Sequence, residues 1–252
     1  MHDSKDVYDQ NVLLLDSHAV AVDIIVRWID DSYPAVLWVN GDTCTGKSTI
    51  ALTITNTLVR DDLLLASFFC SQKHGRRSDA SLVIPTLVDQ IITCIPSLRP
   101  IIQAVFDSNP HILTKPLHIQ AASLIVKPLE SVEPDLRKTL PRVIVIDGLD
   151  QLRDVQGQGA ILETIKCLVQ NTLFPIRCLI TSRREPQILE FFIGFSGNKW
   201  RPLALPPDEA DPDVCPSALS SLESYPINYR ASFNLAKNLE RSTQPRSLPQ
   251  VK

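Results

Sequence analysis

An eight-residue segment, Gly41–Ser48, has the spacing GxxxxGK[ST] of a loop that wraps around phosphate groups. Glycine at its first and sixth positions permits backbone angles that a Cβ would disfavour, so successive N–H groups can point at one anion. The Lys47 ammonium can reach the β and γ phosphates, and the Ser48 hydroxyl can ligate Mg²⁺. The residues predicted to contact a bound nucleoside phosphate are Gly41, Asp42, Thr43, Cys44, Thr45, Gly46, Lys47, Ser48 and Thr49.

A second chemical signal is a carboxylate at the end of a β-branched apolar stretch. Residues 143–146 read Val-Ile-Val-Ile and are followed by Asp147. At the end of a strand near the phosphate loop, Asp147 can hold Mg²⁺ directly or through water, so Ser48 and Asp147 are the predicted metal residues. Asp150 follows three residues later. It can orient and deprotonate an attacking water, or it can instead cap the next helix.

A third polar segment, Thr181-Ser182-Arg183-Arg184, follows another apolar stretch. An arginine at the carboxyl end of a strand can neutralise charge that develops on a γ-phosphate, and we predict Arg183 rather than Arg184 for this role. The alternative is that Thr181 or Ser182 caps a helix while both arginines are solvated. Asp150 and Arg183 are therefore the two candidate catalytic residues.

Alternating strands and helices must position these residues. Short apolar runs predict strands over 35–40, 63–70, 142–146, 178–181 and 200–205. Apolar residues at helical spacing predict helices over 19–30, 47–60, 81–95, 117–129, 160–172 and 185–192. We expect Pro85 to confine or kink the third of these helices. Strands that are apolar on both faces and separated by helices indicate a parallel sheet covered by helices, so the predicted fold class is α/β.

The composition of the 252 residues changes along the chain. Residues 1–33 are predicted to be an N-terminal segment with a lead helix, residues 34–206 the α/β domain, and residues 207–252 a Pro-rich, disordered tail. Eight of the 19 prolines lie from Lys199 onward, and the apolar periodicity is lost from Pro207. Such a segment buries too little apolar surface to offset the entropy of ordering it.

Charge and hydropathy argue against several classes of protein. The chain has 25 Lys and Arg against 28 Asp and Glu, so it lacks the basic field that gathers nucleic acid. No apolar run approaches the ~18 residues of a membrane helix. The six cysteines form no CxxC pair, and the histidines, His18 among them, have no ligand-like spacing. We therefore expect a cytoplasmic protein without a membrane or nucleic-acid partner.

Four segments, in their order along the chain, resemble one family of P-loop proteins. They read GDTCTGKSTIA, SFFCSQKHGRRSDASLVIPTLVDQI, VIVIDGLDQL and LITSRREPQI, as in NACHT-type STAND NTPases of the fungal nephrocystin-like kind. The resemblance covers residues 19–205. It implies a three-layer P-loop NTPase fold with a mainly parallel five-stranded sheet of order 5-1-4-3-2 and helices on both faces. It also implies an ATP/ADP-gated switch that controls self-association and signalling to protein partners.

The resemblance extends to individual residues, with two departures. The Gly41–Ser48 loop resembles the Walker A motif, Asp147 the Walker B magnesium residue, and Arg183 the sensor arginine of the family's TSR motif. The family usually has two consecutive acids after the Asp-Gly-Leu step, but the second is Gln151 here, and an amide cannot act as a base. The loop after the second strand usually reads Ser-Arg, but here it is Ser71-Gln72. We therefore expect hydrolysis to be slow or absent.

Two other readings of the same residues remain open. The family's helical, winged-helix and repeat segments have no counterpart after Leu205, so the resemblance implies a truncated nucleotide module. Such a module can bind nucleotide as an interaction protein without hydrolysing it. A P-loop small-molecule kinase is the second alternative, although the basic cluster Lys73–Arg77 is a poor substitute for the arginine-rich lid that a kinase needs.

Overall fold

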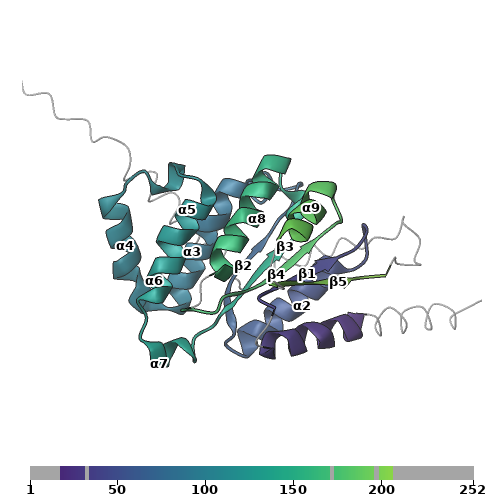
Figure 1. Cartoon of the computed structure of the whole chain (residues 1–252), viewed down its shortest axis with the longest axis horizontal. Helices are drawn as coiled ribbons and strands as arrows, with labels where there is room; N and C mark the ends of the chain where they lie inside the picture. The colour runs from purple at the N-terminus through teal and green to yellow at the C-terminus, as the bar shows by residue number, and fades with distance from the viewer. Residues whose placement is uncertain (1–17, 32–33, 171–172, 196–198, 207–252) are drawn as a thin grey trace, which may run out of the picture.

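The structure is a computed structural model, and it describes residues 18–31, 34–170, 173–195 and 199–206. One sheet contains five strands: β1 (Val36–Asn40), β2 (Leu64–Phe69), β3 (Val143–Asp147), β4 (Arg177–Ser182) and β5 (Trp200–Ala204). Their spatial order is β2-β3-β4-β1-β5, and every neighbouring pair is parallel (Figure 1). This is the predicted order 5-1-4-3-2 read from the opposite edge, so the α/β fold class is confirmed.

Alternate residues of the central strands are buried on opposite faces of the sheet. In β1, Val36 and Trp38 belong to one apolar cluster, whereas Leu37 and Val39 belong to another. The residues of β3 divide between the two clusters in the same way. Because both faces are covered, every residue of β1 and β3 is buried, which explains why these strands read as continuous apolar runs.

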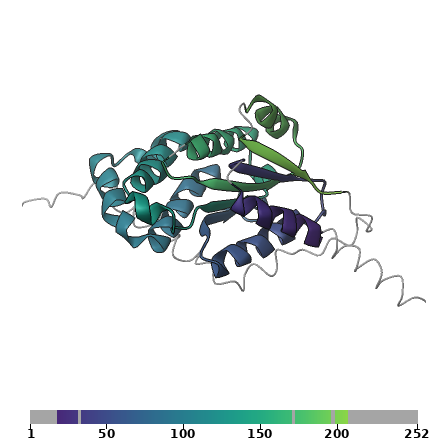
Figure 2. The same cartoon turned by 60° about the horizontal axis from the view of Figure 1, so that its bottom comes forward.

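Helices cover both faces of the sheet, as Figure 2 shows. One face is covered by a helix over residues 18–30, named the lead helix here, and by α2 (Lys47–Arg60). The other face is covered by α3 (Val83–Cys94), α8 (Val155–Gln170) and α9 (Pro186–Gly194). The remaining helices are α4 (Arg99–Ser108), α5 (Leu117–Ala121), α6 (Lys127–Glu130) and α7 (Pro134–Arg137).

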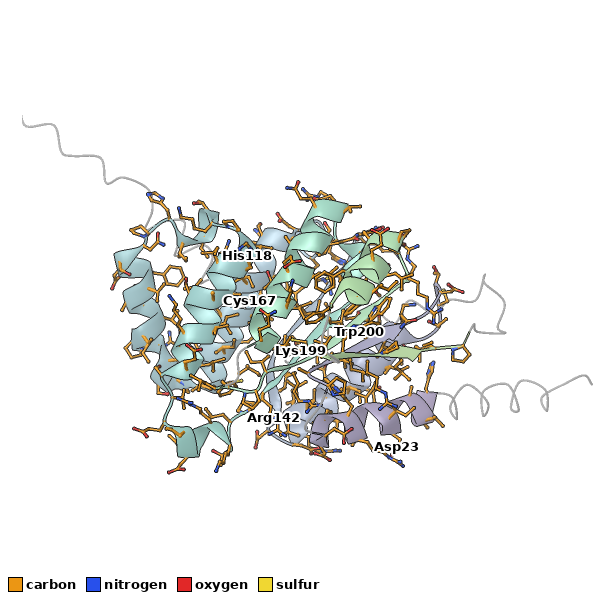
Figure 3. All side chains as sticks on the ribbon, in the orientation of Figure 1. Asp23, His118, Arg142, Cys167, Lys199 and Trp200 are labelled. Atoms are coloured by element: carbon orange, nitrogen blue, oxygen red, sulfur yellow. The ribbon has the colours of Figure 1, made fainter. Side chains whose placement is uncertain are left out.

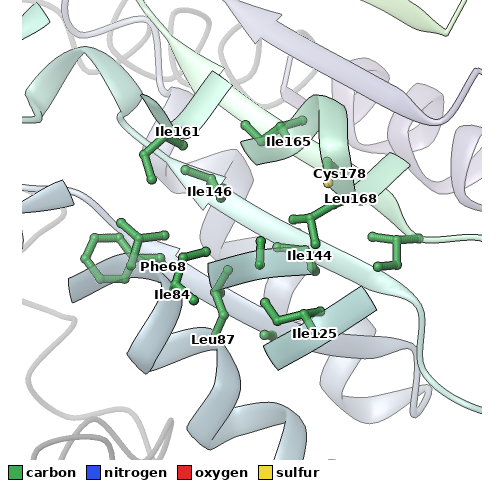
Figure 4. Packing of buried hydrophobic residues seen from close by; sticks show 14 of the residues in the cluster. Phe68, Ile84, Leu87, Ile125, Ile144, Ile146, Ile161, Ile165, Leu168 and Cys178 are labelled. Atoms are coloured by element: carbon green, nitrogen blue, oxygen red, sulfur yellow. The ribbon is translucent and has the colours of Figure 1, made fainter. Parts of the chain in front are cut away.

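The larger apolar cluster lies between the sheet and the helices on the second face. Figure 4 shows Ile144 and Ile146 of β3 among side chains of α3 and α8, including Leu87 and Ile165. At the outer side of this layer, the Cys167 thiol of α8 lies 3.8 Å from the carbonyl oxygen of His118 in α5 (Figure 3). The packing of these helices extends the core well beyond the sheet.

The observed elements agree closely with the predicted ranges. α2 has the predicted bounds, and the predicted helix over 160–172 begins earlier, at Val155; its predicted last two residues lie outside the described ranges. The helix predicted over 81–95 starts with a 3₁₀ turn, Ala80–Leu82, and continues as α3. Pro85 does not break it, because Pro85 lies in the first turn of α3, where an amide N–H has no partner within the helix.

The helix predicted over 117–129 is present but irregular. It runs through α5, a π-helical turn at Ala122–Val126, and α6. Pro128 follows the π turn; it lacks an N–H donor and crowds the carbonyl four residues earlier, and the wider turn accommodates both effects. α4 was not predicted. Its apolar residues do have helical spacing: Ile102 is buried, and Val105 and Phe106 pack partly buried against the core, so the signal was present in the sequence and was missed.

Arg177, the first residue of β4, ties the end of the lead helix to the sheet. Its guanidinium donates to the main-chain oxygens of Trp28, Asp31 and Pro34, the last at 3.1 Å. The same guanidinium lies 4.6 Å from the centre of the Trp28 ring. Burial lowers the pKa of Arg177 to about 10, so the hydrogen bonds must offset a desolvation cost. The lead helix is thus attached to the sheet at its C-terminal end.

No single helix within the described ranges is long and apolar enough to cross a membrane. Two consecutive segments, Ala80–Cys94 and Pro96–Ser108, meet the length and composition requirement only as a pair, and they are bent by 117° relative to each other.

If Arg177 anchors the lead helix to the sheet, replacing it should lower the stability of the domain. We expect Arg177→Gln to lower the free energy of unfolding by about 2 kcal/mol, because buried carbonyl oxygens at the end of the lead helix lose their donors. Arg99→Gln is the matched control, since Arg99 is exposed on α4, and it should change stability by less than about 0.5 kcal/mol. Urea unfolding measures both, and equal stability of the two variants would contradict the anchoring role.

Candidate functional site

The three predicted polar segments meet at one edge of the sheet. β4 lies between β1 and β3, and the registers Asn40↔Ser182 and Ile146↔Ile180 align the carboxyl ends of these strands. The Gly41–Ser48 loop, the segment after Asp147 and the segment after Thr181 therefore leave the sheet side by side. In open parallel sheets, ligands bind outside the carboxyl ends of the strands, so this edge is the candidate site.

The Gly41–Ser48 loop is curved so that its lysine closes it. Gly46 has φ of 75° and Cys44 has φ of 64°, both in the left-handed region that turns main-chain N–H groups toward a common centre. Lys47 Nζ donates to the main-chain oxygens of Gly41, at 2.8 Å, and of Asp42. The ammonium thereby draws these carbonyl groups to itself, while the N–H groups of the first turn of α2 have no acceptor within the helix.

The remaining predicted loop residues support or border this turn. Thr45 is buried, and its hydroxyl donates to the main-chain oxygen of Asp42 at 3.0 Å. Asp42, Thr43 and Thr49 are exposed, while Ser48 is partly buried at the start of α2. The main-chain groups of this loop, rather than its side chains other than Lys47 and Ser48, are therefore the part suited to an anion.

Lys47 lies among charged groups from all three segments. Burial lowers the pKa of the Lys47 ammonium, the negative charges of Asp150, Asp147 and Asp42 oppose this shift, and Arg183 adds to it. These influences place the ammonium within electrostatic range of both predicted acids and the predicted arginine. The structure thus brings together the residues that the sequence predicted for one site.

Asp147 is a buried carboxylate with one satisfied oxygen. Its Oδ1 accepts a 2.6 Å hydrogen bond from the Thr181 hydroxyl, which itself accepts one from Gly148 N–H at 2.9 Å. Its Oδ2 is buried without a hydrogen-bond partner among the described residues. Burial raises the pKa of Asp147, whereas the hydrogen bond from Thr181 and the proximity of the Ser48 hydroxyl lower it. The net shift is upward because desolvation dominates.

The side-chain oxygens of Asp147 and Ser48 fit Mg²⁺ as ligands. The unpartnered Asp147 oxygen and the neighbouring Ser48 hydroxyl are hard oxygen ligands of the kind that Mg²⁺ prefers. Within the described ranges, no group of three or more His, Cys, Asp or Glu side chains could hold a metal ion by itself. Mg²⁺ usually binds through one or two protein oxygens plus water and phosphate oxygens. The arrangement therefore suits a cation that binds together with an anionic ligand.

Asp150 and Arg183, the two predicted catalytic residues, bind each other. Asp150 Oδ1 accepts a hydrogen bond from Arg183 main-chain N–H at 3.0 Å, and Asp150 Oδ2 accepts one from Arg183 Nε at 2.8 Å. The Asp150 side chain is 6% exposed and that of Arg183 is 43% exposed. Arg183 also lies 3.2 Å from a carboxylate oxygen of Glu185. The hydrogen bond that its side chain donates to Asp150 raises the pKa of Arg183.

The alternative roles of these residues as helix caps are not observed. α8 begins at Val155, and Asp154 rather than Asp150 caps its first turn by accepting a 2.6 Å hydrogen bond from Gly157 N–H. α9 begins at Pro186 after Glu185, too far along the chain for Thr181 or Ser182 to cap it. The polar residues after β3 and β4 are thus used in contacts between the two segments.

Several residues that support the site were not predicted for that role. Thr181 was considered as a helix cap, but its hydroxyl orients Asp147. The Trp38 indole N–H donates to Ser182 Oγ at 2.8 Å, and Arg184 Nε donates to Asn40 Oδ1, so these contacts join the ends of β1 and β4. The polar residue Asn40 at the end of an apolar strand was the sequence signal that could have revealed this contact.

The loop after β2 contains the Ser71-Gln72 departure from the family pattern. Gln72 is exposed, whereas Ser71 is buried with its hydroxyl 3.2 Å from His74 Nδ1.

The sheet order, the glycine-hinged loop after β1, the buried acid ending β3 and the Thr-Ser-Arg segment ending β4 together define a P-loop NTPase-type α/β domain. The family described as "Nephrocystin 3, N-terminal" matches residues 21–183, well over half of the chain. The chain belongs to this family. The resemblance to a fungal nephrocystin-like NACHT domain is thereby confirmed.

One similar curated protein is the vegetative incompatibility protein HET-E-1 of Podospora anserina. It is 26% identical over 169 residues, which are 65% of this chain and 12% of HET-E-1. The chain therefore spans only a small part of the length of that relative. Together with the family match, this similarity identifies a NACHT-type domain of the kind found in signalling proteins.

Neutralising Asp147 should stabilise the ligand-free protein. Because the folded-state pKa is raised, the folded protein binds this proton more tightly than the unfolded chain does. The favourable contribution is therefore present below the unfolded pKa of about 4 and is lost as the pH rises through the folded pKa. At pH 7 in EDTA we expect Asp147→Asn to raise Tm by roughly 2–4 °C. The difference from the wild type should shrink toward pH 4.

Asp150→Asn is the matched comparison, because Asp150 is also buried but is paired with Arg183. This substitution weakens an ion pair and should lower the unfolding free energy by about 1 kcal/mol. Differential scanning calorimetry of both variants gives the two shifts. A lower Tm for Asp147→Asn at pH 7 would show that the carboxylate is stabilising in the free protein and would contradict our account of the site.

Proposed function

We propose that this domain binds ATP and ADP together with Mg²⁺ and acts as a nucleotide-gated switch in signalling or assembly, with slow hydrolysis. The observation that carries the proposal is the closed Gly41–Ser48 loop beside a buried acid. Lys47 joins the two ends of the loop, and Asp147 presents an unpartnered oxygen next to Ser48. A loop shaped for an anion and an unpartnered carboxylate oxygen at the same place suit a magnesium nucleotide.

The chain's own residues divide the task of binding. Main-chain N–H groups of the loop and of the first turn of α2 would donate to the phosphate chain, with Lys47 supplying the positive charge. Ser48 and Asp147 would hold Mg²⁺, which when bound neutralises charge on the phosphate oxygens. Thr181 keeps the Asp147 carboxylate oriented toward this position through its 2.6 Å hydrogen bond.

The Asp150–Arg183 pair supports a nucleotide-dependent response. Arg183 is held by a buried acid on one side, but its side chain is 43% exposed and adjoins the loop that contains Lys47. A γ-phosphate would compete with Asp150 for the guanidinium, whereas a diphosphate lacks that group. The proposed switch therefore distinguishes ATP from ADP by the position of Arg183.

The signalling part of the proposal is supported by the family. The similar protein HET-E-1 is described as a vegetative incompatibility protein, and this chain spans 12% of its length. We infer that the present domain reports its nucleotide state through contacts with protein partners or with further copies of the chain.

A second candidate is a protein that binds nucleotide without hydrolysing it. Two observations favour it. The carboxylate of Asp150 already accepts a hydrogen bond from the Arg183 side chain. The residue after Asp150 is Gln151, and its side-chain amide packs close to Gly148, since its Nε2 would lie 3.2 Å from a Cβ placed there. An amide can orient water but cannot accept its proton, so no second acid is available next to Asp150 to act as the base.

Nucleotide binding is tested by calorimetric titration of ADP and ATP into the purified protein with Mg²⁺. We expect Lys47→Ala to weaken binding by about 10- to 100-fold, because a charge-assisted contact to phosphate is lost. Lys73→Ala, in the exposed loop after β2, should leave the affinity unchanged. A folded wild type that binds neither nucleotide would refute the proposed function. Nucleotide identified in the purified protein would in addition report its resting state.

Hydrolysis is tested by single-turnover release of phosphate from ATP, with protein in excess. We expect a rate on the order of 10⁻³ s⁻¹, similar to P-loop hydrolysis that lacks a supplied arginine or base. Lys47→Ala, assayed at the same purity, measures contaminating activity. A wild-type rate equal to that of Lys47→Ala, with nucleotide binding intact, would favour the second candidate over a hydrolysing switch.

A further inference from the structure

The start of the lead helix touches the phosphate loop. If a Cβ were added to Gly46, it would lie 2.2 Å from His18 Nε2 and 2.3 Å from His18 Cε1. The edge of the imidazole that carries Nε2 is therefore in direct contact with the Cα of Gly46. Gly46 is required for two independent reasons, since its φ of 75° is also strained for an L side chain.

Packing along the lead helix and an anchor at its C-terminal end hold His18 in this place. Buried residues of the lead helix, such as Ile25, share an apolar cluster with Ile50 and Ile54 of α2. At its other end, the lead helix is bound by Arg177 at the amino end of β4. The lead helix and α2 lie next to each other on the same face, and both begin at the carboxyl edge of the sheet (Figure 2). The contact with Gly46 is thus set by the packing of a whole helix.

The chemistry of the contact differs from that of ordinary packing. Gly46 lies between Thr45 and Lys47 in the loop, at the start of α2, where main-chain N–H groups have no intrahelical partner. A half-buried imidazole at this point can present its Nε2–H as a hydrogen-bond donor. The side chain therefore adds a donor to the same region that is suited to phosphate.

We propose that His18 is a nucleotide-contacting residue whose Nε2–H donates to the phosphate chain bound in the Gly41–Ser48 loop. This inference rests on the proposed function, and it makes the lead helix a part of the nucleotide site. It also explains why a helix that precedes the sheet is anchored so firmly to the amino end of β4. A shift of the lead helix would remove one donor from the bound phosphate chain.

The test separates a hydrogen bond from mere packing by two substitutions of the same residue. His18→Phe keeps a planar ring against Gly46 but removes the donor, whereas His18→Gln keeps an N–H at a similar distance from the backbone. His118→Phe is the matched control, because His118 is exposed on α5 (Figure 3). Each protein is titrated with ADP and with inorganic tripolyphosphate in magnesium buffer, after its thermal unfolding without ligand confirms that it is folded.

We expect His18→Phe to weaken the binding of both ligands about tenfold, which corresponds to about 1.4 kcal/mol. His18→Gln should stay within about threefold of the wild type, and His118→Phe should equal it. A His18→Phe affinity within twofold of the wild type would overturn the inference, as would equal weakening by both His18 variants, which would indicate packing alone. Failure of the wild type to bind ADP would instead refute the proposed function, and this inference with it.

Discussion

The burial of one carboxylate at the end of β3 constrains the rest of the site. Asp147 lies where water cannot solvate it, and desolvation raises its pKa despite the hydrogen bond from Thr181. The Lys47 ammonium provides only partial compensation, because its own pKa is lowered by burial. Two incompletely solvated charges at the same edge are unfavourable in the free domain. In the proposed complex, an anion and a cation bound together would compensate both charges, so the site would trade stability of the free domain for binding.

The scaffold explains how such a site is held in place. Strands β1, β3 and β4 are buried on both faces, so their carboxyl ends have little freedom to move. Contacts between neighbouring ends, such as Trp38 with Ser182, add hydrogen bonds across the strands. The lead helix spans the same face from the amino edge, at Arg177, to the carboxyl edge, at Gly46. Through this helix, residues on the N-terminal side of the sheet are mechanically connected to the loop.

Much of this could be predicted from the sequence, for identifiable reasons. The start of α2 follows from the loop motif before it. The strands could be predicted from continuous apolar runs, because strands buried on both faces do not alternate apolar and polar residues. The strand order came from the resemblance to a family, since spacing alone does not determine it. The pairing of Asp150 with Arg183 joins residues 33 positions apart, and it was missed because each was assigned a separate role. His18 lies 28 residues before Gly46, and helical periodicity does not say which end of a helix meets a loop.

The Asp150–Arg183 pair also indicates how little motion a switch at this site would need. Asp150 binds Arg183 twice, through the main-chain N–H and through Nε. The main-chain bond can persist while the half-exposed side chain turns away, so the backbone after β4 need not move. An ion pair with one exposed partner contributes only about 1 kcal/mol, which a multiply charged phosphate group can readily outcompete. Released from the Arg183 side chain, Asp150 would keep only its main-chain hydrogen bond, in a site that it shares with Asp147 and Lys47. In the proposed switch, nucleotide binding would therefore rearrange the charges around Lys47 while the backbone after β4 stays in place.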